Sequence, residues 1–162
     1  LDFICHLRPI IIAVLLVAVI AASVMSYKAK QHVQGDYLRG NRIVSTDKKA
    51  AELAYLAAAS EDNLKTFPQH PDVPNAIIAL ARLYVSETRL EDALAQYRRL
   101  EQYYPNWRYI HQVYEEIANI LQRQGDIQQA NHYFRKCAQM DQHSIAGKRC
   151  NKKINTISKV SP

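Results

Sequence analysis

Glycine and proline are scarce in this sequence, whose 162 residues include only 4 Gly and 6 Pro. Folds built from many short strands need these residues at their turns, and long disordered segments are usually rich in them. The sequence also lacks a Gly-rich phosphate loop, a G-x-S-x-G nucleophile motif and a zinc signature. These absences argue against a turn-rich β fold, against disorder and against the common enzyme classes.

Titratable side chains show no catalytic or metal-binding spacing. None of the histidines stands at a ligand spacing from a second His, Cys or carboxylate; they are His6, His32, His70, His111, His132 and His143. Glu115 and Glu116 are adjacent, so on a helix they point in different directions and do not form a general acid–base pair. We therefore expect no enzyme, no catalytic residue, no metal and no cofactor.

What the chain does have is one long apolar run near its N-terminus. Residues 9–25, PIIIAVLLVAVIAASVM, contain no charge, and their one hydroxyl is that of Ser23. With their neighbours they give a lipid-contacting segment over residues 7–27, which is long enough to cross a bilayer. A buried helix of this length would show a polar stripe, and this run shows none. We predict a transmembrane anchor over residues 1–27; the alternative is a cleaved signal peptide, since small residues lie near the end of the run.

Helix-forming residues dominate the rest of the chain. We interpret residues 28–46, which are polar and include two glycines, as a helical extension fading into a juxtamembrane linker. Ala, Leu, Gln, Glu, Lys and Arg are frequent over residues 47–140, and apolar residues recur there with helical periodicity. The expected helices cover residues 47–67, 74–87, 88–104, 109–124 and 127–140, with a short helix from Ser144 onward. The expected fold class is all-α.

An internal repeat emerges when the chain is shifted against itself by 37 residues. Every pair is apolar, and both alanines meet alanines: Ile77 with Tyr114, Leu80 with Ile117, Ala81 with Ala118, Tyr84 with Leu121, Leu90 with Ile127, Ala93 with Ala130, Tyr97 with Phe134 and Leu100 with Cys137. Small residues let two helices approach closely, and aromatic residues then fill the gap toward the next helix. The pattern therefore predicts a repeated unit of two packed helices.

These positions resemble the tetratricopeptide repeat (TPR) family, whose unit has about 34 residues. The match lies in the small residues at the helix crossing, in Tyr97 four residues after Ala93, and in the closing Pro105. Gln142 departs from the closing proline in the second unit. The resemblance implies an α-solenoid over residues 47–142, with a degenerate half-unit at 47–71, units at 74–105 and 111–142, and a basic capping helix and tail at 143–162. The segment FPQHPDVPNAIIALARLY also looks like repeat proteins of the bacterial envelope.

In this family, residues off the packing face of each first helix line a concave groove that binds proteins. The resemblance thus implies partner-binding residues at Asn75, Ile78, Arg82, Gln112, Glu115 and Asn119. Aromatic residues cluster at the turn between the two units, including Trp107 and Tyr109. They either cover the core or serve as interface anchors. Both interpretations stay open.

Two further features lie near the C-terminus. Cys137 and Cys150 would fall opposite each other if the chain turned near residue 142, and a disulfide there would require an oxidising compartment; the alternative is a pair of buried thiols. The tail holds Lys148, Arg149, Lys152, Lys153 and Lys159. It is either a solvated face or a surface for anionic lipid or an acidic partner. It has no aromatic residue to stack on a base, so we expect no nucleic acid.

Together these features predict a single-pass membrane protein whose helical domain binds other proteins. One hypothesis is an accessory or scaffold subunit of a membrane complex, like the bitopic repeat proteins of the bacterial envelope that it resembles. The alternative is an envelope assembly factor or chaperone that binds client proteins transiently. More Lys and Arg residues lie just after the anchor than before it, which favours a cytoplasmic domain. The cysteine pair and the envelope resemblance favour the periplasmic side of an inner membrane, which we expect.

Overall fold

The computed structural model describes residues 2–140 and 142–160, with side chains over 11–140 and 142–157. The described chain is all-helical, as expected, and contains no strand. Its helices are α1 Asp2–Ile43, α2 Lys48–Ala58, α3 Glu61–Thr66, α4 Asp72–Ser86, α5 Leu90–Tyr103, α6 Ile110–Arg123, α7 Ile127–Met140 and α8 Ile145–Val160. The expected contribution of residues 7–10 to the span, and that of Lys159 to the basic tail, lie outside the described side chains.

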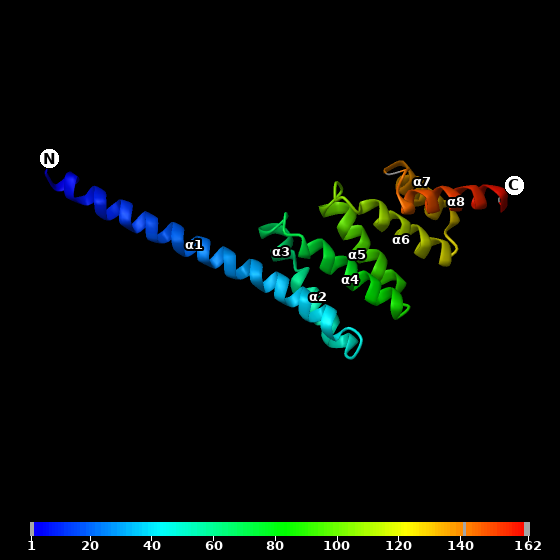
Figure 1. Ribbon diagram of the computed structural model, residues 1–162, viewed down its shortest axis with the longest axis horizontal. Helices are drawn as coiled ribbons and strands as arrows, with labels where there is room; N and C mark the ends of the chain where they lie inside the picture. The colour runs from blue at the N-terminus through cyan, green and yellow to red at the C-terminus, as the bar shows by residue number, and fades with distance from the viewer. Residues whose placement is uncertain (1, 141, 161–162) are drawn as a thin grey trace.

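Helix α1 forms a long rod whose first half extends away from the other helices (Figure 1). It is long and apolar enough to cross a membrane, and the rest of the molecule leaves its apolar residues exposed over positions 11–27. Apolar side chains such as Val17 and Met25 are 66% and 72% exposed. So many exposed apolar side chains on one segment would be unfavourable in water. The first half of α1 therefore has the form of a lipid-facing helix.

The second half of α1 corrects our interpretation of residues 28–46 as a linker. The helix continues without a break to Ile43 and packs against α2 and α4. Val33 is 1% exposed, and Gly40 lies beneath the Tyr55 ring, where its missing side chain allows the two helices to meet closely. Gly35 and Gly40 are both accommodated within the helix because packing on one side offsets their weak helix propensity.

The helix expected over residues 47–67 is divided into α2 and α3. Asp47 caps the start of α2 by accepting a hydrogen bond from the Ala50 N–H at 2.9 Å. Ser60 then caps α3, because its hydroxyl accepts from the Asn63 N–H at 3.3 Å. The Asn63 side-chain amide donates to the carbonyl oxygen of Ala57 at 2.9 Å, one of the carbonyls at the end of α2 that have no partner four residues later within the helix. This local hydrogen bonding, rather than a proline, ends the first helix.

Helices α4 to α7 form two hairpins of like construction, α4–α5 and α6–α7 (Figure 1). The same turn joins the helices of each pair. Thr88 has a φ of 61° in the first turn, and Gly125, which is 37 positions later, has a φ of 85° in the second. The Arg89 N–H donates to the Tyr84 carbonyl at 2.9 Å, and the equivalent Asp126 N–H donates to the Leu121 carbonyl at 3.0 Å. The repeat found in the sequence is thus also a repeat of backbone geometry.

The core follows the alanines at the helix crossings. Four alanines are completely buried where the paired helices meet, namely Ala81, Ala93, Ala118 and Ala130. Tyr97 and Phe134 are also completely buried and fill the space beside them. The last helix, α8, is longer than the short helix expected and packs against α7 and α6. One continuous core therefore runs from the second half of α1 to α8.

Candidate functional site

A hollow of about 620 Å³, which we call the groove, opens between α1, α2, α4, α6 and the turn before α6. It is lined by Tyr37, Asn41, Val44, Lys48, Tyr55, Asn75, Ile78, Ala79, Arg82, Leu83, Ser86, Trp107, Tyr109 and Gln112. Its size is within the range of sites that hold small ligands or peptide side chains. The lining mixes aromatic rings, aliphatic groups and two cations, with no carboxylate among these residues.

Six of the eight predicted partner-binding residues line the groove. Asn75, Ile78 and Arg82 project from α4 one turn apart, which places them along one face of that helix. Gln112 projects from the first turn of α6, and Trp107 and Tyr109 precede that helix. The faces of α4 and α6 that point away from the core thus bring together side chains from both repeats. The core residues hold these two helices in place.

The other two predicted residues lie outside the groove. Glu115 accepts hydrogen bonds from the guanidinium of Arg149 on α8 at 2.5 Å, and its side chain is 13% exposed. Asn119 is half-buried on the same helix. Gln122, one turn further, accepts a hydrogen bond from Lys153 at 3.2 Å. Helix α8 therefore covers the end of this face, and Glu115 is part of a structural contact.

The basic tail is correspondingly divided. Lys148, Arg149, Lys152 and Lys153 are all exposed, but of these four cations only Arg149 and Lys153 form hydrogen bonds to α6. The tail lies at the opposite end of the molecule from the apolar half of α1 (Figure 1). This separation does not favour contact between the tail and the bilayer that α1 would cross.

Two cations give the groove its charge. Lys48 donates to the Ser86 hydroxyl at 3.5 Å, and Arg82 lies 4.0 Å from a Glu116 carboxylate oxygen. Burial raises the pKa of the Glu116 carboxyl, and the Arg82 charge opposes this rise. The Arg82 side chain is 58% exposed, so part of its charge faces the solvent at the edge of the groove, where it can pair with an acidic ligand as well as with Glu116.

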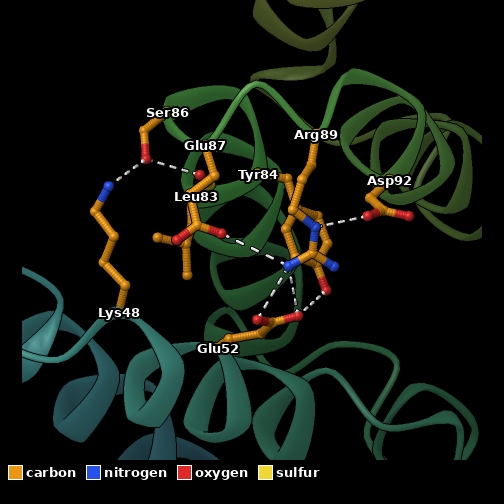
Figure 2. Close-up of polar contacts among 8 residues, drawn as sticks. All are labelled: Lys48, Glu52, Leu83, Tyr84, Ser86, Glu87, Arg89 and Asp92. Carbon is orange, nitrogen blue, oxygen red and sulfur yellow. Dashed lines mark hydrogen bonds and ion pairs between the residues drawn. The ribbon is translucent and has the colours of Figure 1, made fainter.

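A polar network holds α2 against the α4–α5 turn and so fixes one wall of the groove (Figure 2). Glu52 on α2 accepts hydrogen bonds from the Tyr84 hydroxyl at 2.8 Å and from the Arg89 guanidinium at 3.2 Å. The guanidinium also donates to Asp92 at 2.7 Å and stacks on the Tyr84 ring at 4.1 Å. Burial, followed by the hydrogen bond to Glu52, raises the pKa of Tyr84 to about 12.

The aromatic cluster before α6 is packed on the core in part and exposed in part. Trp107 is half-buried and packs against the core, with its ring edge-on to that of Tyr109 at 5.0 Å between centroids. Tyr103 and Tyr109 are 40% and 37% exposed, and the Arg108 guanidinium stacks on Tyr109 at 4.4 Å. The cluster therefore covers the core from one side and presents rings to the surroundings from the other.

Cys137 and Cys150 are joined as a disulfide, with their Cα atoms 6.2 Å apart. The bond links α7 to α8, and both residues are completely buried. Among the described residues, no group of three His, Cys, Asp or Glu side chains could hold a metal ion.

The groove wall supplied by α1 is the part of the site that sequence reasoning missed. Tyr37, Asn41 and Val44 come from the segment that we interpreted as a linker. A signal was present: Val33, Tyr37, Gly40 and Val44 recur at intervals of four, three and four residues. This spacing is a helical stripe with a small residue in it, as at Ala81, but the two glycines in the segment argued against it.

Comparison with models of known protein families finds no match, and comparison with curated protein sequences finds none either.

Proposed function

We propose that this chain is a single-pass membrane protein whose TPR-like helical domain binds another protein through the groove. The observation that carries the proposal is that six residues predicted to bind a partner line one hollow. The apolar half of α1 would anchor the domain and raise its concentration near partners in the same membrane. The best description of such a protein is an accessory or scaffold subunit of a membrane complex.

The construction of the groove supports this role. Its walls are held by buried alanine crossings and by the Glu52 network, so little conformational freedom is lost when a ligand binds. The ligand that fits combines an apolar side chain, for contact with Ile78 and Trp107, with an acidic group for Lys48 or Arg82. We therefore expect the ligand to be a negatively charged segment of a protein.

The disulfide supports a domain on the non-cytoplasmic side. Disulfides persist in oxidising compartments, and this one is shielded from reductants by burial. The charge count around the anchor favours the opposite orientation. Labelling a Gln128→Cys variant in which Cys5 is replaced by Ser, with a membrane-impermeant maleimide in intact cells, distinguishes the two, because position 128 is exposed on α7 and Cys5 precedes the apolar run. We expect labelling, and labelling that occurs only after lysis contradicts the proposed side.

Site-specific photo-crosslinking in native membranes tests the binding function. A photoreactive amino acid replaces Ile78 or Gln112 in the groove, and replaces Gln128 on α7 as the matched control. We expect one discrete protein adduct from both groove positions and none from the control. Equal adducts at all positions, or no adduct at the groove, would refute the proposal.

A transient chaperone is the second candidate, because the groove combines an exposed cation with a mixed apolar and polar lining. Segments of many different client proteins could bind such a surface. Stoichiometry after purification in mild detergent separates the two. A subunit is recovered with one partner at a constant ratio. A chaperone is recovered with several clients, each well below one per chain.

A further inference from the structure

The long helix α1 ties the position of the domain to the position of the membrane. It runs from the apolar segment into the domain core without a break. Because an α-helix rises about 1.5 Å per residue, Lys30 lies only about 4.5 Å beyond Tyr27 along the axis. The polar headgroup layer extends about 5–8 Å beyond the hydrocarbon on each side of a bilayer. A chain anchored through residues 7–27 would therefore hold Lys30 within the headgroup layer.

Two turns of the domain lie near this level. A hollow lined by Lys30 and residues 66–71 places the α3–α4 turn beside α1 at this point. A second hollow is lined jointly by that turn and residues 103–108, so the α5–α6 turn adjoins it. Both turns lie at the same end of their hairpins, on the side toward the apolar half of α1 (Figure 1). We call residues 66–71 and 103–109 together the rim.

The composition of the rim is that of a membrane interface. Neither of its turns contains Asp or Glu. Tyr103 and Tyr109 are exposed, Trp107 is half-buried, and Arg108 is exposed beside them. Trp and Tyr favour the headgroup level because their rings are apolar and their edges form hydrogen bonds, and Lys and Arg there attract anionic lipids.

Nearby carboxylates reduce this attraction only in part. Glu61 is paired with Arg99 at 3.1 Å, and Glu101 is paired with Lys136 at 2.7 Å. Asp62 and Asp72 flank the first turn, and Lys65 and Lys30 lie near the same turn. The positive excess is therefore modest, and the aromatic rings account for most of the expected affinity.

We propose that the rim docks onto the lipid headgroups of the bilayer that α1 crosses, so that the domain lies against the membrane. The inference rests on the proposed membrane anchor. Docking would fix the orientation of the groove relative to the bilayer, because Trp107 and Tyr109 belong to both the rim and the groove. A partner would then be met close to the membrane surface.

The chain offers its own probe, because Trp107 is its one tryptophan. The full chain is reconstituted into nanodiscs of phosphatidylcholine and phosphatidylglycerol that contain a lipid with a nitroxide on its headgroup. We expect the label to reduce Trp107 emission, and aqueous iodide to quench that emission less in nanodiscs than in detergent. Full access to iodide with no quenching by the labelled lipid would overturn the proposal.

Arg108 and Arg123 provide a matched pair of variants. They flank α6 at its two ends, both are exposed, and each replacement by Gln removes one positive charge. Arg108→Gln should lower the ratio of docked to undocked domain about fivefold in anionic nanodiscs. Arg123→Gln should leave the ratio unchanged; equal effects of the two substitutions would contradict docking through the rim.

The failure of this inference is distinguishable from failure of the anchor. Extraction of the reconstituted chain with alkaline carbonate tests the anchor alone. A chain that resists extraction but shows no quenching by the labelled lipid retains its anchor and lacks the docked state. A chain that is extracted overturns both.

Discussion

Replacing Gly40 by alanine tests whether the second half of α1 is truly a packed helix of the domain. A Cβ atom at Gly40 would lie 2.5 Å from Cε1 and 2.7 Å from Cδ1 of Tyr55, well inside contact distance. Tyr55 has little room to retreat. It is 2% exposed, its ring adjoins that of Tyr37, and its hydroxyl donates to Asn41 at 2.9 Å. The substitution therefore forces α1 and α2 apart.

The expected change in stability combines one stabilising and two destabilising effects. Alanine gains about 1 kcal/mol over glycine in a helix interior. Overpacking a filled site costs about 1–3 kcal/mol. Loss of the hydrogen bond between Tyr55 and Asn41 costs about 1 kcal/mol. Gly40→Ala should therefore lower the free energy of unfolding by about 1–3 kcal/mol in total.

Gly35→Ala is the matched control on the same helix. A Cβ atom there meets nothing within 4 Å, so only the helix propensity changes and stability should rise by up to about 1 kcal/mol. The two variants should then differ by about 1–4 kcal/mol in stability, or roughly 4–16 °C in melting temperature. Circular dichroism of the full chain in mild detergent measures this difference.

Limited proteolysis provides a second readout if α1 detaches without global unfolding. Gly40→Ala should speed cleavage after Lys28, Lys30 and Arg42, because these bonds become accessible when the helix leaves the core. If Gly40→Ala is as stable and as resistant as Gly35→Ala, α1 is not packed on Tyr55. The groove would then lack the wall that α1 supplies.

Three further outcomes are expected. Thr88→Gly should stabilise the domain and Gly125→Ala should destabilise it, each by about 1 kcal/mol in urea unfolding, because both positions have positive φ; effects of the same sign would contradict the shared turn geometry. Complete reduction of the disulfide between Cys137 and Cys150, which lie 13 residues apart, should cost roughly 3 kcal/mol; if thiol alkylation shows both cysteines reduced and the melting temperature is unchanged, the bond is not stabilising. Since the pKa of Tyr84 is raised from 10.0 to about 12, its stabilising effect is complete below pH 10 and is lost as pH rises through 12. Between pH 10 and about 12, the melting temperature should therefore fall less for Tyr84→Phe than for the unsubstituted chain, and an equal fall for both would refute this.

The helices themselves were largely predictable from local signals. The 37-residue repeat holds in the apolar positions, in the buried alanines and in the turn hydrogen bonds. The boundary at Ser60 was missed because the cap depends on the Asn63 amide reaching back to the end of α2. The ends of helices depend on such side-chain hydrogen bonds, which periodicity does not reveal.

A helical chain, a repeat of its helices and a first segment apolar enough for a membrane could all be predicted from the amino-acid sequence. These properties follow from residue spacing and composition, which act over one or two turns of helix. The packing of the helices was needed to see that α1 also forms a wall of the groove and that Glu115 pairs with Arg149 on α8. Such contacts join segments far apart in the chain, and their energy depends on how the helices fit together rather than on any local pattern.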